Sequence, residues 1–551
     1  MKRFTLTVLT VLLAYSFVYA GGIVTNTNQS TAWTRMLVRD ASIDIDAVYY
    51  NPAGLTKLKD GFYISINNQS IFQKRTITSS YPYLNSNTFE GTVNAPLFPS
   101  VYMAFKTGRW AFSVGVMPIG GGGSATFENG LASMETPIAG LAHQFAPYGV
   151  TGYSSDIYFD GSSIYWGIQG GITFEITKNI SIYAGVRYNM ASNTYEGHMK
   201  DVTFKTAAGD IRTDAFMLQV AQQAEDGSQQ ANYVGEQMQP LIDYGMGDKT
   251  IEELVAGGII TPDQGEQIAG GLIQLGYPPD AVNAMPVSQI QTTYFGAAET
   301  LHQQSQELTA GSTLFNDQEV DVKQTGNGIT PIIGLDLSFL EDDLIFAFKY
   351  EFKTNMDVVN ETVPGKGFNI GIDPATGQPI EMFPDGDTTN ADIPAMLSIG
   401  VRYKITDKVN VQGGYHTYFD SKAGWATTDD GTELIDHNYT EYAVGAEWNV
   451  SQKFLLSAGY LATITGVNDK YQSDLGYSLS TTTFGLGAAF AFSPAVKLQL
   501  GGFYTMYNGG TYTKTDNNFD PPVVYGETYD KSTWGISLGL DIAIISKKKN
   551  K

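Results

Sequence analysis

The chain has 551 residues, of which 56 are acidic and 33 basic, so its formal net charge at pH 7 is −23. This length exceeds that of an ordinary single soluble domain, and the acidic balance argues against a nucleic-acid-binding protein, which needs a basic face. The sequence has no cysteine, which excludes disulfides and thiolate metal sites. Its 60 glycines and 33 tyrosines suit a membrane β-barrel with aromatic belts at the two interfaces.

Residues 1–20 predict a secretory signal peptide. Lys2 and Arg3 form the positive start, residues 4–17 the apolar stretch, and residues 18–20 (Val-Tyr-Ala) a cleavage site. The alternative is a transmembrane anchor, but a spanning helix needs about 20 apolar residues, and no stop-transfer charges flank this one. We therefore expect the segment to direct export.

Residues 21–59 lack strand alternation and do not fit a barrel wall. They include Asn51, Pro52 and Ala53, shortly before the first predicted strand. An even-stranded barrel that starts from the periplasm leaves this segment at the periplasmic mouth, where it can fold into the lumen. We predict a plug, or hatch, over 21–59 and a barrel over 60–551. A simple tight turn also explains Asn51 and Pro52, because both residue types favour turns.

From residue 61 onward, segments of about ten residues alternate apolar and polar side chains. Every second connection is a short polar turn, such as residues 107–109 (Thr-Gly-Arg), and the others are long. Alternation turns one strand face to an apolar phase and the other to a polar one, and short turns at one end with long loops at the other are typical of transmembrane β-barrels. We predict an all-β, antiparallel transmembrane barrel of about fourteen strands. The predicted strands are 61–73, 97–107, 110–119, 162–176, 180–193, 328–340, 344–357, 392–405, 409–420, 438–450, 454–465, 478–492, 496–508 and 532–546.

The third predicted strand meets residues that disturb pairing. Pro118 cannot donate to a ladder, and Gly120, Gly121, Gly122 and Gly123 permit irregular backbone. A flexible outer loop that begins at Pro118 would explain these residues.

The connection over 194–327 is too long for a plain loop. Residues 250–253 and 261–264 each fit a helix capping box, the second with proline at the first helical position. We predict a helical extracellular insertion. It either forms part of a binding groove or packs only on itself.

Strand register turns three cations, Arg187, Lys349 and Arg402, towards the lumen, because a charge that faces lipid costs about 2–4 kcal/mol at the midplane. They are candidates to bind the carboxylate of a ligand. Alternatively, they pair with Glu351 or Glu447 and keep the lumen solvated.

No catalytic arrangement, phosphate-binding loop or spaced metal-ligand cluster is present in the sequence. We therefore expect a protein that is not an enzyme and has neither a cofactor nor a metal site. The acidic outer loops suggest solubility, or divalent cations that bridge them to anionic surface glycolipid.

The chain before the first strand runs from a signal through Gly21-Gly22 and a Ser/Thr/Asn-rich stretch to residues 44–54 (DIDAVYYNPAG). This order, in front of such a barrel, resembles the FadL/TodX family. These are outer-membrane transporters of long-chain fatty acids and aromatic hydrocarbons. The resemblance implies that Asn51, Pro52 and Ala53 lie in a hatch and that the insertion offers an outer capture site. It also implies that the third strand bends inward near Pro118 and residues 120–123 and opens a window in the wall. The basic end, residues 547–551, departs from barrels that close on an aromatic residue.

The expected function is passive uptake of hydrophobic compounds across a bacterial outer membrane, which the chain would cross many times as a monomer. Its partners would be a fatty acid or aromatic hydrocarbon, outer-membrane lipids and surface glycolipid, but no nucleic acid. Hatch rearrangement would open the path, and the ligand would leave sideways through the wall. The alternatives are a general diffusion porin, which would have no plug, and a surface-binding or adhesion barrel, whose function would lie in the insertion.

Overall fold

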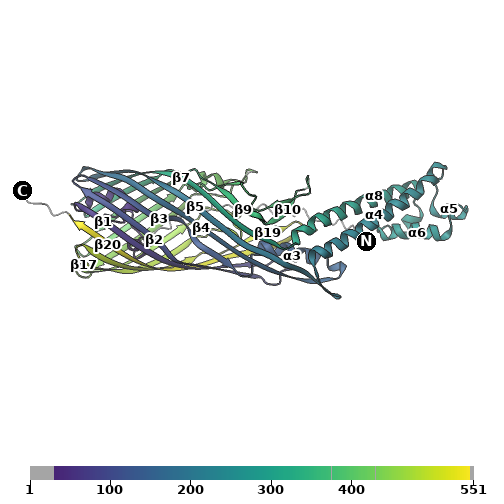
Figure 1. Ribbon diagram of the computed structural model, residues 1–551, viewed down its shortest axis with the longest axis horizontal. Helices are drawn as coiled ribbons and strands as arrows, with labels where there is room; N and C mark the ends of the chain where they lie inside the picture. Colours follow the sequence, from purple (N-terminus) through teal and green to yellow (C-terminus); the bar gives the residue numbers. More distant parts are fainter. Residues whose placement is uncertain (1–29, 374, 429, 546–551) are drawn as a thin grey trace, which may run out of the picture.

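A computed structural model describes residues 30–373, 375–428 and 430–545 as a closed antiparallel β-barrel (Figure 1). Fourteen strands form the wall, and β1 (Gly61–Ser79) closes it by pairing with β2 (Thr88–Thr107) on one side and β20 (Val523–Ile545) on the other. The predicted fold class is confirmed. The predicted signal peptide and the basic C-terminal residues lie outside the described ranges.

Three wall strands consist of two segments each. β9 continues the line of β8, β12 precedes β13, and β19 follows β18, because each two-segment strand pairs with the same neighbours. The other wall segments are β3 (Trp110–Phe127), β4 (Val150–Thr177), β5 (Ile180–Thr206), β7 (Gln318–Phe339), β8 (Leu344–Glu351), β9 (Asp357–Gly367), β12 (Thr388–Asn390), β13 (Met396–Lys404), β14 (Val409–Tyr418), β15 (Tyr439–Asn449), β16 (Phe454–Ile464), β17 (Thr481–Ser493), β18 (Val496–Tyr507) and β19 (Gly510–Asp516).

The two faces of the wall differ in polarity as their alternation predicts. On β5, Ile182 and Val186 are 42% and 55% exposed, whereas Ser181 and Arg187 are 1% and 3% exposed. On β20, Trp534, Ile536 and Leu538 also lie on the exposed outer face. An apolar outside and a polar lumen are what a bilayer-spanning barrel requires.

Several strands run further outward than their alternation indicates. β4 begins at Val150 rather than at 162, and β5 ends at Thr206 rather than at 193. Beyond the membrane the outer face no longer needs apolar side chains, so alternation fades while the ladder continues to the pair Val150–Thr206. The predicted insertion over 194–327 was therefore too wide, because β5 and β7 occupy its two ends.

The remaining insertion is helical. It contains the short strand β6 (Gly209–Arg212), which pairs with β5, and then five helices. Both predicted capping boxes are present, Thr250 with Glu253 and Thr261 with Gln264. The helices are α4 (Thr213–Asp243), α5 (Ile251–Ala256), α6 (Pro262–Gln274), α7 (Pro279–Asn283) and α8 (Val287–Ser312).

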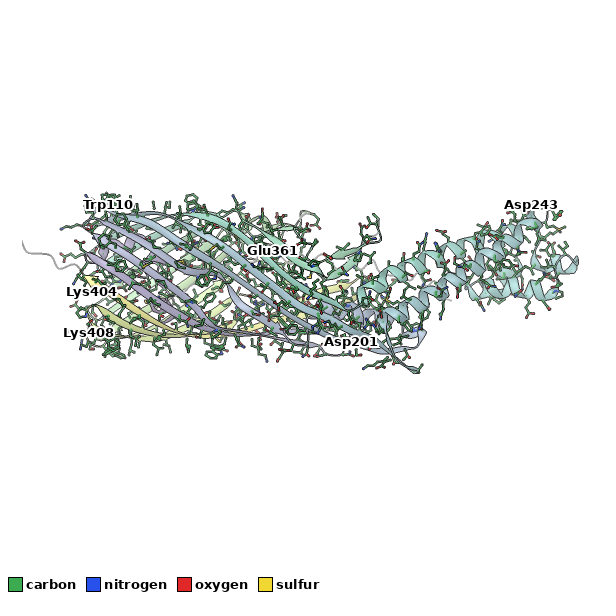
Figure 2. All side chains as sticks on the ribbon, in the orientation of Figure 1. Trp110, Asp201, Asp243, Glu361, Lys404 and Lys408 are labelled. Carbon is green, nitrogen blue, oxygen red and sulfur yellow. The ribbon has the colours of Figure 1, made fainter. Side chains whose placement is uncertain are left out.

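The helices α4 and α8 lie side by side and project from the barrel as an arm. Figure 2 places Lys404 and Lys408 at the short-turn end of the barrel and Asp243 near the far tip of the arm. The arm therefore stands on the long-loop, extracellular side. Smaller elements decorate the loops: α3 (Ala132–Gln144), η2 (Ala146–Tyr148), η3 (Thr313–Phe315), η4 (Asp420–Lys422), η5 (Gly424–Ala426), and the hairpin of β10 (Asn369–Ile372) with β11 (Pro379–Glu381).

The described part of the N-terminal segment lies inside the barrel as a plug. It folds into α1 (Thr31–Thr34), α2 (Ala47–Tyr50) and η1 (Pro52–Lys57), and most of its side chains are buried. Its two ends contact different parts of the wall: α1 packs on β17, β18 and β20, whereas η1 packs on β4, β5 and β7. The plug therefore bridges the lumen.

Glycines on the inner face of the wall make room for the plug backbone. A Cβ atom at Gly459 would lie 1.8 Å from the carbonyl oxygen of Met36, and one at Gly400 would lie 2.5 Å from the Cβ of Asp40. Real Cβ contacts do not approach so closely, so these two wall positions admit the plug only without a side chain.

Replacement of Gly459 by valine should push the plug away from β16. Overpacking typically costs about 1–3 kcal/mol, so we expect a less stable plug and a higher single-channel conductance in planar bilayers. Gly502→Val is the matched control, because a Cβ there meets only the carbonyl oxygen of Gly535 at 3.5 Å. Equal conductance of the wild type and both variants would contradict close contact between plug and wall.

Candidate functional site

A cavity of about 490 Å³ lies inside the barrel above the plug. Trp33 and Leu37 of the plug line it from below, residues of β1, β16, β17, β18 and β20 form much of its wall, and Leu131 and residues 474–479 belong to the outer loops over it. This volume falls within the range of about 300–1,000 Å³ that is typical of small-molecule sites. The cavity is therefore the candidate binding site.

The outer loops over the cavity are tied together by Asp474. Its buried carboxylate accepts a 2.7 Å hydrogen bond from the backbone N–H of Ser133, in the first turn of α3. Burial raises the pKa of the Asp474 carboxyl above its usual value. This contact joins the loop after β16 to the loop after β3 and helps to cover the cavity.

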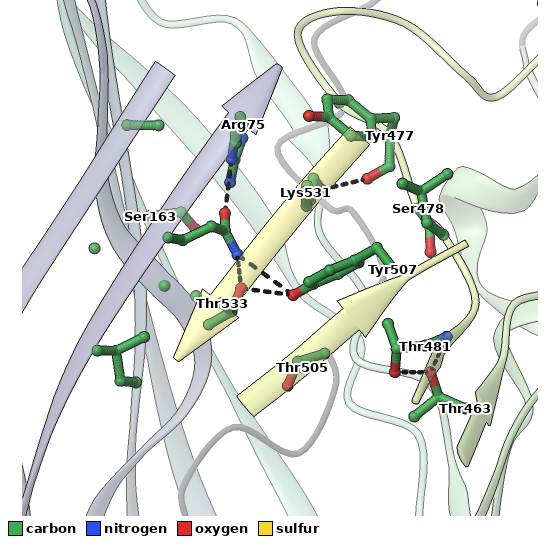
Figure 3. A pocket seen from close by; sticks show the side chains of 18 of the residues that line it. Arg75, Ser163, Thr463, Tyr477, Ser478, Thr481, Thr505, Tyr507, Lys531 and Thr533 are labelled. Carbon is green, nitrogen blue, oxygen red and sulfur yellow. Dashed lines mark hydrogen bonds between the residues drawn. The ribbon is translucent and has the colours of Figure 1, made fainter. Parts of the chain in front are cut away.

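One side of the cavity carries two cations, Arg75 of β1 and Lys531 of β20 (Figure 3). The Nζ of Lys531 donates to the carbonyl oxygen of Tyr477 at 2.8 Å and lies 3.8 Å from the centre of the Tyr477 ring. Arg75 Nε donates to the side chain of Gln73 at 2.9 Å. Among the residues that the structure describes, neither cation has a carboxylate within salt-bridge distance.

The polar side chains next to these cations form hydrogen bonds with one another. Gln73 Nε2 donates to Thr533 Oγ1 at 2.8 Å, and the hydroxyls of Tyr507 and Thr533 lie 3.0 Å apart (Figure 3). Apolar side chains occupy other parts of the lining: Trp33, Leu37, Ile71, Phe127, Phe159, Leu461 and Phe503. The lining thus combines an apolar surface with two basic side chains, and an amphiphile with an anionic head group matches both.

Buried ion pairs fix the plug below the cavity. Arg35 pairs with Glu447 of β15 at 2.5 Å, and Arg39 binds Asp46 through two hydrogen bonds of 2.7 and 2.9 Å. Both arginines are only 1% exposed. Removing one member of such a pair leaves an uncompensated buried charge, which is strongly destabilising. Arg39 Nη1 also lies 3.8 Å from Glu447, so both arginines link the plug to β15, whereas the bonds to Asp46 stiffen the plug itself.

His416 of β14 joins the plug to the wall at the edge of the cavity. Its Nε2 lies 2.5 Å from Asp40 of the plug, and its Nδ1 lies 2.7 Å from Glu441 of β15. With a carboxylate on each ring nitrogen, the side chain is fully engaged, so its contribution is to hold Asp40 in place.

The predicted triplet Asn51, Pro52 and Ala53 anchors the other side of the plug. Asn51 Nδ2 donates to Asp336 of β7 at 2.7 Å, and its Oδ1 accepts from the N–H of Ala53 at 3.2 Å. Thr173 of β4 donates its hydroxyl to the carbonyl oxygen of Pro52 at 2.8 Å. Asn51 therefore makes a local turn and a contact with the wall at once, as both interpretations of the triplet require.

The three cations proposed as carboxylate ligands do not line the cavity. Arg187 and Lys349 both pair with Glu351, and Lys349 also donates to the carbonyl oxygen of Tyr49 in the plug at 3.1 Å. Arg402 lies near the periplasmic turn, where it donates to the carbonyl oxygen of Asp342 at 3.4 Å. The structure thus favours the alternative for Arg187 and Lys349, internal pairing that holds the plug.

The sequence analysis does not identify Arg75 and Lys531 as lumen-facing cations because the predicted strands are too short. The first strand was predicted to end at 73 and the last to begin at 532, whereas β1 continues to Ser79 and β20 starts at Val523. Both cations keep the lumen-facing parity of their strands. Extending the alternation by one or two residues would have identified them.

Pro118 and residues 120–123 lie on the rim of a gap in the wall. β2 and β3 pair at Val93–Ala125 and again from Val101–Val116, but residues 94–100 and 117–124 between these pairs have no partner across the seam. β3 continues to Phe127 and stays paired with β4 through two bulges. The interpretation of Pro118 as the start of an outer loop was therefore wrong, because the strand bends and continues.

The cavity reaches this gap. Gly121, Gly122 and Gly123 belong both to its lining and to the unpaired stretch of β3. Proline also recurs along both rims, at Pro96 and Pro99 of β2 and at Pro118 of β3. Proline has no N–H to donate and is tolerated at strand edges, so these sequences suit a seam that stays unpaired.

The helical insertion has a core of its own at its tip and a second contact at its base. Leu254, Leu272 and Ile290 belong to the distal core, and Phe216 and Met217 of α4 pack in a cluster with Phe145 after α3. The described residues therefore support an arm that packs largely on itself and rests on the outer loops. Whether it also captures ligand stays a prediction.

No helix among the described residues is long and apolar enough to span a membrane.

No protein-family profile and no curated protein sequence matches the chain. Among solved structures, a FadL homologue from Pseudomonas aeruginosa aligns with a TM-score of 0.56 and 14% identity, over 95% of this chain and 99% of that one. The toluene transporter TodX from Pseudomonas putida aligns with a TM-score of 0.46 and 11% identity, over 94% of this chain and 99% of that one. The toluene transporter TbuX from Ralstonia pickettii gives 0.45 and 11%, over 91% and 94%. The chain therefore has the fold of the FadL homologue, which in this chain is a closed fourteen-stranded antiparallel β-barrel with the N-terminal segment in its lumen.

Proposed function

We propose that the protein is a passive outer-membrane channel for hydrophobic compounds, and that its ligands are long-chain fatty acids or similar anionic amphiphiles. The observation that carries the proposal is the cavity above the plug, which reaches an unpaired seam between β2 and β3. A compound that enters from the outer loops is held there and leaves sideways into lipid.

The lining favours an anionic amphiphile over a neutral hydrocarbon. Arg75 and Lys531 line the cavity without a carboxylate partner among the described residues. A carboxylate head group would supply that partner, and charge-assisted hydrogen bonds are among the stronger polar contacts in proteins. The apolar surface, which includes Phe159 and Leu461, would take the chain.

Exit through the seam follows from the free energy of the chain in water. Burial of each methylene is worth about 0.8 kcal/mol, so release of a sixteen-carbon chain into the aqueous periplasm would forfeit roughly 12 kcal/mol. Exit between β2 and β3 keeps the chain in an apolar phase throughout. The channel then needs no energy source, because the ligand moves from one apolar environment to another.

A modest rearrangement of the plug would complete the path. Trp33 and Leu37 line the cavity from the plug side, so an occupant touches the plug directly. The contacts of Arg35 and Arg39 with Glu447 of β15 disfavour wholesale removal of the plug. They also argue against a general diffusion porin, whose lumen stays open.

Substitution of the two cavity cations tests the ligand class. In Arg75→Gln and Lys531→Gln we expect the Kd for a fluorescent long-chain fatty acid to rise by about tenfold or more in each, because a hydrogen bond to a charged group is worth roughly 1.5–3 kcal/mol. The Kd for the fatty alcohol of equal length should change little. Lys74→Gln is the matched control, since this cation is exposed and pairs with Glu90. Equal losses for acid and alcohol would exclude a head-group role.

A disulfide across the seam tests the exit route. A Cβ at Gly123 would lie 3.1 Å from the Cβ of Ala95, within reach of a disulfide, whose Cβ atoms are about 3.8 Å apart, although the φ of +87° at Gly123 makes the cysteine there strained. Oxidised Ala95→Cys/Gly123→Cys should bind fatty acid normally but deliver it into liposomes far more slowly, and reduction should restore delivery. The control is Val93→Cys/Ala125→Cys, which links residues that are already paired. Undiminished delivery through the fully cross-linked seam would rule out sideways exit there.

A further inference from the structure

The seam between β2 and β3 poses a hydrogen-bonding problem on its β2 side. In the hydrocarbon region, unpaired backbone N–H and C=O groups find no water and cost several kcal/mol each. Residues 94–100 of β2 have no partner on β3. Something other than β3 must therefore hold this stretch in its bent form.

β2 carries a bulge against its other neighbour, β1. Gln69 pairs with Phe98 and Ile71 pairs with Ala95, so that Pro96 and Leu97 together oppose Ser70. An extra residue bends a strand and disrupts its ladder locally. The bulge pushes Leu97 outward, where it is 77% exposed.

Two side chains of β1 take over the hydrogen bonds of the bulge. Asn68 Oδ1 accepts from the N–H of Phe98 at 2.9 Å, and Asn68 Nδ2 donates to the carbonyl oxygen of Pro96 at 3.2 Å. Ser70 Oγ donates to the same carbonyl oxygen at 2.8 Å. The backbone of the bulge is thereby satisfied by side chains rather than by an adjacent ladder.

The position of these two residues on β1 makes the arrangement unusual. They continue the outward parity of Phe62 and Ile66, which are 38% and 47% exposed on the apolar surface. A polar side chain on such a face is unfavourable unless its hydrogen bonds are made within the protein. Asn68 and Ser70 meet that condition through the bulge of β2.

We propose that Asn68 and Ser70 are positioning residues that keep the lateral seam open by holding the bulge of β2 away from β3. This inference rests on the proposed sideways exit and adds its structural cause. The two side chains touch neither the cavity nor the ligand; they act through the backbone of Pro96 and Phe98.

The double variant Asn68→Leu/Ser70→Ala tests the proposal. Loss of three hydrogen bonds should let the bulge relax towards β3, and we expect delivery of fatty acid into liposomes to slow by about tenfold, with an unchanged Kd for binding. Spin labels at Leu97→Cys and Gly122→Cys, on the two rims, should report a shorter or broader distance distribution in the variant. Ser70→Thr keeps the hydroxyl and should retain delivery.

The control is Thr482→Val, a similar loss of a hydroxyl on the outward parity of β17, far from the seam. Heat-modifiable gel mobility verifies that every variant forms a barrel. If the double variant is folded, and its rim distance and delivery match those of the wild type, the inference is wrong. If the disulfide between positions 95 and 123 leaves delivery unchanged in an otherwise wild-type protein, the proposed sideways exit is wrong. If that disulfide blocks delivery but the double variant delivers like the wild type, only the role of Asn68 and Ser70 is wrong.

Discussion

Satisfaction of backbone hydrogen bonds in lipid is the constraint on which the rest of this structure depends. No water reaches the hydrocarbon core, so a chain that crosses it with strands must close into a barrel. β1 meets both β2 and β20 for this reason. At the long seam between β2 and β3, prolines at positions 96, 99 and 118 remove donors, and side chains of β1 bind backbone groups of the bulge. A gap in a membrane barrel is therefore a built feature.

Closure creates a polar lumen that must be filled or left open, and here the plug fills much of it. The fit depends on the absence of side chains at wall positions such as Gly459 and Gly400. The plug is held to the wall by buried charges, Arg35 and Arg39 of the plug with Glu447 of β15. Such pairs contribute modestly to net stability but make displacement of either partner costly. The plug is thus held in one position while its upper surface remains available to a ligand.

The cavity, plug and seam form one continuous arrangement. Trp33 of the plug and Gly121 to Gly123 of β3 line the same cavity, so a bound amphiphile would touch both the element that closes the lumen and the rim of the seam. The cations Arg75 and Lys531 lie on β1 and β20, and only β2 separates β1 from β3 along the wall. A ligand whose head group these cations held would therefore lie close to the strands that border the seam.

Local pattern alone determined the barrel, its fourteen strands, their inner and outer faces, and the capping boxes at Thr250 and Thr261, because two-residue alternation and turn chemistry are read within a few residues. Local pattern did not determine the strand ends where the outer face leaves the membrane. Arg75 and Lys531, which lie at such ends, were therefore not predicted. Only the tertiary structure decided which inward cations meet the cavity, since Arg187 and Lys349 find Glu351 first. It also decided that Asn68 and Ser70 bind the bulge of β2, because such contacts join residues far apart in the chain, and no local pattern encodes their distance.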